Sequence, residues 1–219
     1  MEHKEKYNMS SDKELIHYWD EYYKKDNTPS FPSPFAEYVA NKLSTQQDIL
    51  EIGCGNGRDS KFFSSKGHHV TGLDRSREAI ELCKNLYSNE PIEFFFGTIT
   101  DIVKTHKKTY DLIYSRFVIH AMSLDEELET LRISYKLLNK NGHFFIECRS
   151  VNDPLVNKGE ILSHTERVEG HYRRFIILEE LKHRLVQVGF DVIETIESNG
   201  LAEYKDEDPV VIRVKAIKV

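Results

Sequence analysis

The sequence lacks a long apolar run, a paired-cysteine motif and an excess of basic charge. No stretch reaches the roughly 18 apolar residues that a transmembrane helix needs, and the first ten residues, M-E-H-K-E-K-Y-N-M-S, contain no apolar core of a secretory signal. The formal net charge is −6, which disfavours binding to nucleic acid. Three cysteines without a C-x-x-C pair disfavour a disulfide framework and indicate a cytoplasmic protein.

Several motifs of catalysis are also missing. There is no G-x-S-x-G nucleophile turn, and no lysine follows the glycines as in a phosphate-binding loop. The chain has ten histidines, but none stands with acids at a spacing that indicates a metal site, so we expect no metal.

Strand and helix patterns alternate along the chain. Its 219 residues, 39% of them hydrophobic, suit one globular domain. This alternation predicts an α/β fold: a mostly parallel sheet with helices on both faces. The expected strands are 48–52, 68–74, 92–96, 110–115, 143–148, 190–196 and 209–219, the last two pairing antiparallel, and the expected helices are 57–66, 77–87, 125–138 and 177–188.

Two segments fall outside this rhythm. Residues 1–47 carry aromatic helical patterns and a proline-rich turn, and we expect a helical cap across the open end of the sheet. Residues 150–174 contain Pro, Gly and Asn without a clear period, and we expect a long loop that acts as a substrate lid.

Three glycines follow the first expected strand, in L-E-I-G-C-G-N-G-R-D-S. Glycine lets the backbone approach a ligand closely, and the next helix offers free N–H groups. The spacing of Gly53, Gly55 and Gly57 differs from the dinucleotide fingerprint G-x-G-x-x-G, because Arg58 stands where that fingerprint needs glycine. Asp74 closes the second strand, where a carboxylate can accept both hydroxyls of a ribose. These features indicate an adenosine-containing ligand.

The two segments L-E-I-G-C-G-N-G-R-D-S and V-T-G-L-D-R-S resemble the first motifs of class I S-adenosylmethionine-dependent methyltransferases. The resemblance covers about residues 15–219 and implies a Rossmann-like, seven-stranded sheet with an antiparallel last strand. It implies S-adenosyl-L-methionine as cofactor and S-adenosyl-L-homocysteine as product. The cofactor residues that it implies are Glu51, Gly53, Cys54, Gly55, Asp74, Arg75, Thr98, Ile99 and Ser115. Thr98 stands where many members carry an acid that binds adenine.

The resemblance also implies where the methyl group and the acceptor lie. Trp19 and Tyr23, four residues apart, would cover the cofactor or simply pack on the sheet. Arg116 would lie near the methyl group, and His120 would act as a catalytic base or only pack beside the next helix.

Basic residues at the two ends of the expected lid favour a small anionic acceptor. Arginine forks match the oxygens of a phosphate ester, phosphoramidate, nucleotide-linked sugar or carboxylate, although charged side chains on a loop also serve solvation. The candidates for acceptor binding are Arg149, His171, Arg173 and Arg174. The segment H-Y-R-R-F is loosely similar to stand-alone methyltransferases of capsule polysaccharide clusters.

The sequence is therefore compatible with three functions. The first is methyl transfer to oxygen, rather than nitrogen, of a small molecule by a monomer or homodimer that contacts neither membrane nor nucleic acid. The second is a nicotinamide-dependent oxidoreductase, which the position of Gly57 disfavours. The third is a non-catalytic module that binds S-adenosylmethionine.

Overall fold

A computed structural model describes residues 2–25 and 28–219, with the side chains of 13–25 and 28–219. Residues 1, 26 and 27 of the expected N-terminal cap lie outside the described residues. The helices are α1 (Glu2–Tyr23), α2 (Pro34–Ala40), α3 (Arg58–Ser65), α4 (Arg77–Leu86), α5 (Ile99–Thr105), α6 (Leu124–Leu137) and α7 (Leu178–Val188), with short 3-10 turns η1 (Ile119–Ala121) and η2 (Pro154–Asn157). The strands are β1 (Asp48–Ile52), β2 (His69–Asp74), β3 (Ile92–Phe96), β4 (Tyr110–Arg116), β5 (Leu138–Arg149), β6 (Glu160–Ile161), β7 (Glu166–Glu169), β8 (His171–Arg174), β9 (Phe190–Ser198) and β10 (Val211–Lys218).

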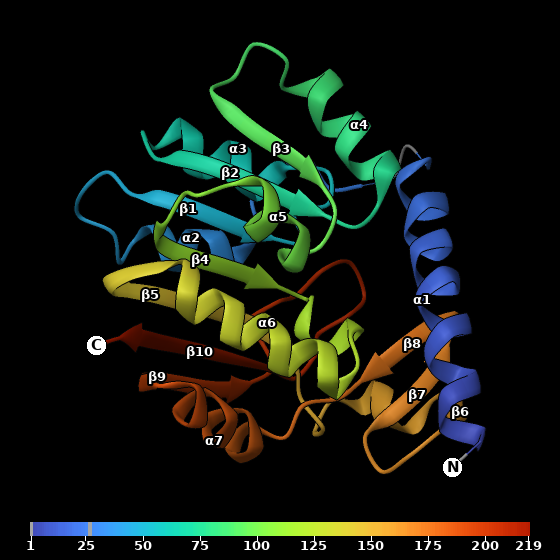
Figure 1. Ribbon diagram of the computed structural model, residues 1–219. Helices are drawn as coiled ribbons and strands as arrows, with labels where there is room; N and C mark the ends of the chain where they lie inside the picture. The colour runs from blue at the N-terminus through green and yellow to red at the C-terminus, as the bar shows by residue number, and fades with distance from the viewer. Residues whose placement is uncertain (1, 26–27) are drawn as a thin grey trace.

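Seven strands form the central sheet in the order β3-β2-β1-β4-β5-β10-β9 (Figure 1). Its first five strands pair in parallel, and β10 pairs antiparallel with both β5 and β9. The predicted sheet, with its antiparallel last strand, is therefore confirmed. The strand order reverses between β1 and β4, and such a reversal opens a crevice at the carboxyl ends of the strands.

The inner strands β1 and β4 bury side chains on both faces, which is why their sequences are largely apolar. Leu50 and Ile113 belong to the larger core, which contains residues of α5, α6 and α7. Their neighbours Ile49 and Leu112 belong to a second core with residues of α2 and α3. The period of two along β1 and β4 thus divides the apolar side chains between the two layers of helices.

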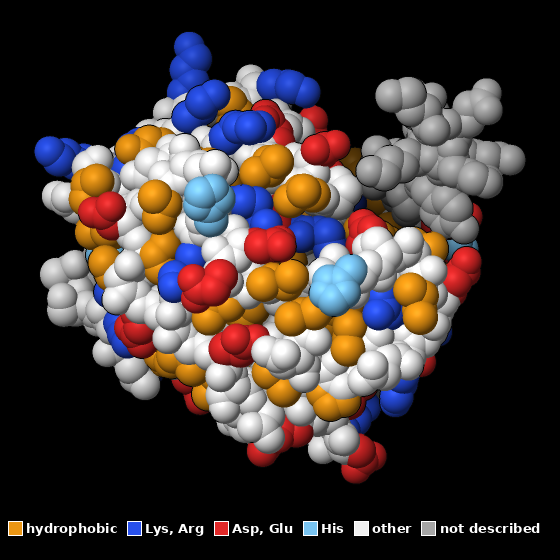
Figure 2. Space-filling view, turned by 90° about the horizontal axis from the view of Figure 1, so that it is seen from below, with side chains coloured by type: hydrophobic (Ala, Val, Ile, Leu, Met, Phe, Trp, Pro, Cys, Tyr) orange, Lys and Arg blue, Asp and Glu red, His pale blue; other side chains and the backbone are white. Residues whose placement is uncertain are grey.

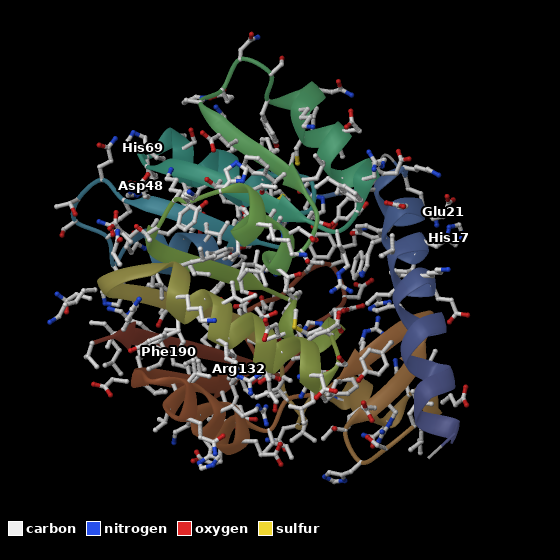
Figure 3. All side chains as sticks on the ribbon, viewed as in Figure 1. His17, Glu21, Asp48, His69, Arg132 and Phe190 are labelled. Carbon is white, nitrogen blue, oxygen red and sulfur yellow. The ribbon has the colours of Figure 1, made fainter. Side chains whose placement is uncertain are left out.

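Helix α1 runs past the carboxyl ends of the strands rather than over a face of the sheet (Figure 1). It contacts α4 on one side and β8 on the other. Figure 3 shows His17 and Glu21 on the outer side of α1, and both are exposed. Helix α1, which falls within residues 1–47, thus borders the carboxyl ends of the strands.

Two segments differ from the sequence-based expectation. Residues 99–105 form α5, where we expected no helix; Thr98 and Asp101 make a reciprocal capping box that starts it. The expected loop of residues 150–174 contains a three-stranded antiparallel sheet, β6-β7-β8. Its strands have only two to four residues, too short for a period of two to be visible in the sequence.

The face of the molecule in Figure 2 intersperses acidic and basic side chains, without a large field of one charge. None of the described helices is long and apolar enough to cross a membrane. In the described part of the chain, no three His, Cys, Asp or Glu side chains are grouped as metal ligands.

Candidate active site

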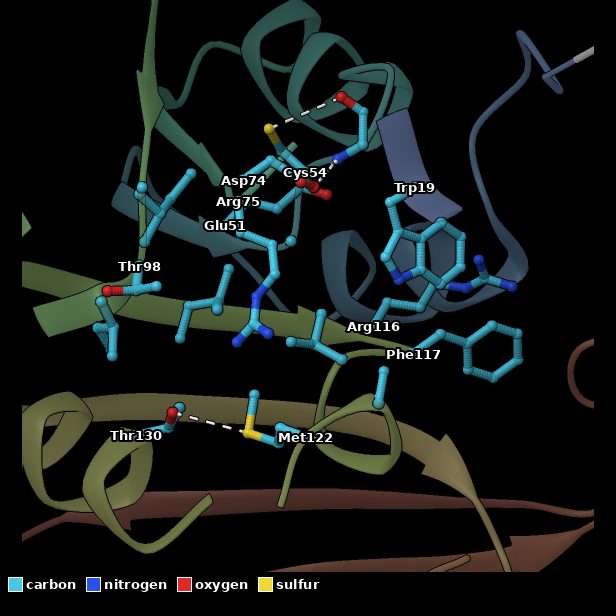
Figure 4. A pocket seen from close by; sticks show the side chains of 18 of the residues that line it. Trp19, Glu51, Cys54, Asp74, Arg75, Thr98, Arg116, Phe117, Met122 and Thr130 are labelled. Carbon is cyan, nitrogen blue, oxygen red and sulfur yellow. Dashed lines mark hydrogen bonds between the residues drawn. The ribbon is translucent and has the colours of Figure 1, made fainter. Parts of the chain in front are cut away.

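A pocket of about 380 Å³ lies at the carboxyl ends of β1, β2, β3 and β4 (Figure 4). Each strand contributes the residues at its end, and α1 supplies Trp19 and Tyr23 from the outer side. Five acidic and three basic residues line the pocket, which favours a ligand with a positive charge. The charged lining residues are Glu51, Arg58, Asp59, Asp74, Arg75, Arg116, Glu126 and Glu129.

The glycine turn is covered by the protein's own side chains. Gly55 has φ +54°, and a Cβ atom there would lie 2.3 Å from the hydroxyl oxygen of Tyr23. Gly53 has φ +73°, and a Cβ atom there would lie 2.2 Å from a methyl carbon of Val118. Both positions therefore need glycine for backbone conformation and for space. The close approach that we expected from a ligand is made at Gly55 by the phenol of Tyr23.

Asp74 is held by two backbone N–H groups. Gly55 donates to Oδ2 and Ser76 donates to Oδ1, each at 2.8 Å. Burial raises the pKa of Asp74, while these two hydrogen bonds oppose that rise. Because each carboxylate oxygen keeps a further lone pair, Asp74 can still accept two hydroxyl hydrogens.

Glu51 lies on the floor of the pocket beside a second carboxylate. It is buried, and it accepts a hydrogen bond from the hydroxyl of Ser60. Burial, and next the negative charge of Asp59, raise the pKa of Glu51 well above its usual range. Asp59 is itself fixed by Ser33 and by the Tyr114 hydroxyl, which donates at 2.8 Å. A cationic group of a ligand would relieve the repulsion between these two carboxylates.

The far end of the pocket is closed by an ion pair and a helix start. The Arg75 guanidinium binds the Glu126 carboxylate at 2.9 Å, which joins the end of β2 to α6. Thr98 and Ile99 line the pocket at the start of α5. The Thr98 hydroxyl donates to Asp101 at 2.7 Å, accepts in the capping box of α5, and lies 2.6 Å from the Thr100 hydroxyl. Its hydrogen bonds are therefore made within the start of α5.

The end of β4 brings Arg116 and Phe117 to the opposite side of the pocket. Arg116 Nε donates to the buried Glu147 at 2.9 Å, and Arg213 holds the other oxygen of that carboxylate at 2.7 Å. Phe117 has φ +58°, a left-handed conformation that costs a non-glycine residue about 1–2 kcal/mol. Its ring lies under the Arg116 guanidinium at 4.3 Å and edge-to-face with the ring of His120 at 5.3 Å.

His120 lies behind Phe117 and does not itself line the pocket. Its Nδ1 accepts a hydrogen bond from the backbone N–H of Arg149 at 3.3 Å. Burial, and next the charges of Arg149 and Arg173, lower the pKa of His120 well below its usual value. The imidazole is therefore neutral, and since Nδ1 accepts, its proton is on Nε2. This geometry favours a hydrogen-bond donor rather than the expected base.

The candidate acceptor residues gather around His120. Arg149 binds Asp153 at 2.9 Å and Glu207 at 2.8 Å. Arg173 donates to the carbonyl of Glu169 at 2.9 Å, and among the described side chains no carboxylate forms a salt bridge with it. Burial, and next the charge of Arg149, lower the pKa of Arg173. An anion between these two guanidiniums would relieve their repulsion.

His171 joins this basic cluster (His120, Arg149, His171 and Arg173) to the pocket. Its ring packs on Tyr18 at 4.3 Å and on Trp19 at 5.2 Å, and Trp19 lines the pocket. Burial and the neighbouring arginines lower the pKa of His171 to about 3. Its Nδ1 is buried and has no partner among the described residues, which leaves it available to a ligand.

Two expected site residues have other surroundings. Arg174 is buried in an ion pair with Glu127, and it also donates to the carbonyl oxygen of Met122 at 3.2 Å. It therefore fixes the η1 turn, which is a different task from the acceptor binding that we expected. Ser115 is fully buried outside the pocket lining, because alternate residues of β4 face opposite sides of the sheet.

The pocket brings together most of the expected cofactor residues: Trp19, Tyr23, Glu51, Gly53, Cys54, Gly55, Asp74, Arg75, Thr98 and Ile99. Arg116, which we expected to be catalytic, also lines it. Phe117 and Glu126 also line the pocket, and neither was expected from the sequence. Phe117 directly follows an expected strand, so its place in the sequence could have predicted that it lines the pocket. The place of Glu126 could not have been predicted, because it depends on an ion pair with Arg75, 51 positions away.

A mostly parallel sheet of this strand order, with a glycine turn after β1 and an acid closing β2, defines the class I S-adenosylmethionine-dependent methyltransferase fold. The model of a family described as a methyltransferase domain matches residues 19–195. The chain therefore belongs to this methyltransferase family, and its cofactor is S-adenosylmethionine.

Curated relatives are distant. A ubiquinone biosynthesis O-methyltransferase of Marinobacter nauticus is 23% identical over 72% of this chain and 69% of its own length. An uncharacterized methyltransferase of Alkaliphilus oremlandii is 28% identical over 69% of this chain and 66% of its own length. The chain thus spans about two thirds of the length of these relatives.

Solved structures share the fold at low identity. The CcbJ methyltransferase of Streptomyces caelestis superposes with a TM-score of 0.72 at 15% identity, covering 92% of this chain and 98% of that one. A glycopeptide N-methyltransferase, MtfA, solved with S-adenosylmethionine gives a TM-score of 0.66 at 15% identity, covering 89% of this chain and 90% of that one. The Marinobacter nauticus relative is an O-methyltransferase and MtfA is an N-methyltransferase, so the fold alone does not name the acceptor.

Proposed function

We propose that the protein transfers a methyl group from S-adenosylmethionine to an anionic oxygen of a small molecule. The acceptor class includes phosphate esters, phosphoramidates, nucleotide-linked sugars and carboxylates. The observation that carries the proposal is the hydrogen bond from the Arg149 N–H to His120 Nδ1 inside a cluster of arginines.

The pocket fits the cofactor on three grounds. Its volume of about 380 Å³ suits a nucleoside-sized ligand. Asp74 has lone pairs for the two ribose hydroxyls, and Glu51 with Asp59 offers negative charge to a sulfonium or ammonium group. Tyr23 and Trp19 present aromatic rings, which attract a sulfonium by about 0.5 to 2 kcal/mol. When bound, S-adenosylmethionine supplies an electrophilic methyl group.

The residues on the acceptor side suit an oxygen that is already ionised. A neutral hydroxyl or an ammonium nitrogen would need a base to remove its proton. His120 has its acceptor nitrogen occupied by Arg149, so it donates from Nε2. An ionised oxygen needs no base, and it is stabilised by the donors that this cluster offers. Arg173, His120 and Arg149 therefore bind and orient the acceptor beside Phe117.

Methyl transfer depends mainly on alignment and on the exclusion of water. Phe117 and Trp19 separate the cofactor pocket from the basic cluster, and each contacts both. Arg116 is held between Glu147 and the Phe117 ring, so its position is fixed at the boundary. These three side chains would set the line along which an acceptor oxygen meets the methyl group.

The experiment is incubation with isotopically labelled S-adenosylmethionine and a panel of acceptors matched in size but differing in charge. Phosphate monoesters and carboxylates should gain label, while the corresponding neutral alcohols and amines should not. Arg173→Met should raise the KM of an anionic acceptor at least tenfold and leave the affinity for S-adenosylhomocysteine unchanged. Label found in the neutral alcohol or amine, with Arg173→Met equal to the parent, would refute the anionic acceptor.

A further inference from the structure

Asp20 of α1 is bound to the first turn of α4. Its Oδ1 accepts a hydrogen bond from the Ser76 hydroxyl at 2.6 Å and lies 3.4 Å from the backbone nitrogen of Glu78. A carboxylate at this position also interacts favourably with the positive end of the α4 dipole. Asp20 thereby joins the helix outside the pocket to the helix that follows β2.

Ser76 carries this attachment on to the pocket. Its hydroxyl accepts from the Ala79 N–H at 3.1 Å as the N-cap of α4, while its own N–H donates to Asp74 Oδ1 at 2.8 Å. The other oxygen of Asp74 is held by Gly55. One side of the Asp74 carboxylate is therefore oriented by a residue whose side chain is in turn oriented by Asp20.

The same helix also covers the pocket. Trp19, next to Asp20, lines the pocket, and the Tyr23 hydroxyl, one turn further on, rests against Gly55. The Asp20–Ser76 bond thus lies beside the contacts through which α1 meets the glycine turn. Loss of that bond would therefore loosen both the Asp74 carboxylate and the packing of Trp19 and Tyr23 over the pocket.

We propose that Asp20 is a positioning residue for cofactor binding: through Ser76 it orients the Asp74 carboxylate and holds Trp19 and Tyr23 over the pocket. This proposal rests on the proposed function in one respect, that Asp74 binds the ribose hydroxyls of the cofactor. Asp20 itself touches no reacting atom. Its effect is on how long the nucleoside stays bound, rather than on the chemistry of methyl transfer.

The test measures binding and release of S-adenosylhomocysteine by the full chain. Calorimetry gives the Kd, and stopped-flow fluorescence of Trp19, which is the only tryptophan in the sequence, gives the dissociation rate. Asp20→Ala should raise the Kd about tenfold, mainly through faster dissociation. Asp20→Asn keeps an oxygen that can accept from Ser76, so it should recover most of the affinity. Glu21→Ala is the matched control, because Glu21 is exposed on the same helix and pairs only with Lys24 in the described part of the chain.

A double-mutant cycle separates positioning from general loosening of α1. Because Asp20 acts partly through the Asp74 carboxylate, Asp20→Ala should raise the Kd clearly less in an Asp74→Asn background than in the parent, and the remaining rise is due to looser packing of Trp19 and Tyr23. A Kd for Asp20→Ala equal to that of Glu21→Ala, or losses that multiply in the double variant, would overturn the inference while the parent still binds. Absence of binding heat with the parent would instead refute the cofactor site on which the proposal rests.

Discussion

The Nδ1 atom of His120 accepts a hydrogen bond from the backbone N–H of Arg149 at 3.3 Å, and this relationship fixes which nitrogen carries the proton. The turn η1 and the end of β5 are brought together so that a buried, neutral imidazole can donate only from Nε2. As the proposed function requires, this arrangement favours donation of a hydrogen bond to an anion over removal of a proton.

The first prediction concerns His120→Gln. Glutamine keeps an N–H donor but cannot act as a base near neutral pH, so kcat should stay within about tenfold of the parent. The kcat–pH profile of the parent should also lack an acid limb near pH 6.5, since burial and the arginines keep the pKa of His120 well below that value. Steady-state assays between pH 5.5 and 8 with a carboxylate acceptor, which stays ionised over this range, check both points. A loss in kcat of a thousandfold or more, together with an acid limb in the parent, would show that His120 acts as a general base.

The second prediction concerns Asp74→Ala. Two hydrogen bonds from ribose hydroxyls to a charged acceptor contribute about 1.5–3 kcal/mol each, so the Kd for S-adenosylhomocysteine should rise at least a hundredfold. Asp191→Ala, an exposed position in β9, is the control and should bind like the parent. Calorimetry at one pH and salt concentration is sufficient for the comparison. Equal affinities of Asp74→Ala and the parent would exclude a ribose contact at this carboxylate.

The third prediction compares Phe117→Gly with Phe117→Ala. Both variants lose the aromatic ring, but only glycine relaxes the left-handed backbone, which has φ +58°. The glycine variant should therefore be more stable than the alanine variant by about 1–2 kcal/mol, although glycine usually destabilises. Urea denaturation of the two proteins measures the difference directly. An alanine variant at least as stable as the glycine variant would show that the strain is absent.

The fourth prediction concerns His171 and acid stability. The unfolded chain protonates this histidine near pH 6.5, whereas the folded protein does so only near 3. Between these values the unfolded state binds more protons, so the free energy of unfolding falls as the pH is lowered from about 6.5 towards 3. When the pH is lowered from 7.5 to 5, the free energy of unfolding of His171→Gln should fall by about 1–2 kcal/mol less than that of the parent. Urea denaturation at the two pH values measures this, and contributions of His68, His120 and His143 cancel because both proteins retain them. Identical pH dependence in both proteins would contradict the depressed pKa.

The sheet and the cofactor side of the pocket could be predicted because their signals are local in the sequence. The glycines at 53–57 and Asp74 follow strands directly, and parallel strands bring their carboxyl ends to one edge. Helix α5 had a local signal as well, the capping pair of Thr98 and Asp101, which the strand pattern before it obscured.

The acceptor side could not be predicted in the same way, because its roles depend on partners distant in the sequence. Arg173 and Arg174 are neighbours with equal charge, yet Arg174 is neutralised by Glu127, 47 residues away, and Arg173 has no such pair among the described residues. The alternation of β8 places the two side chains on opposite sides, and only the fold determines which side meets Glu127. The tautomer of His120 likewise depends on Arg149, 29 residues further on.

The position of β10 has a consequence for biosynthesis. This strand is threaded between β5 and β9, so β9 has no neighbour in the main sheet until Val211–Lys218 has left the ribosome. Until then β5 presents an unpaired edge whose buried residues include Phe144 and Ile146. Nascent chains paused before residue 211 should therefore need chaperones and be prone to aggregate. The part of the sheet that carries the pocket, β1 to β4, can form well before that point.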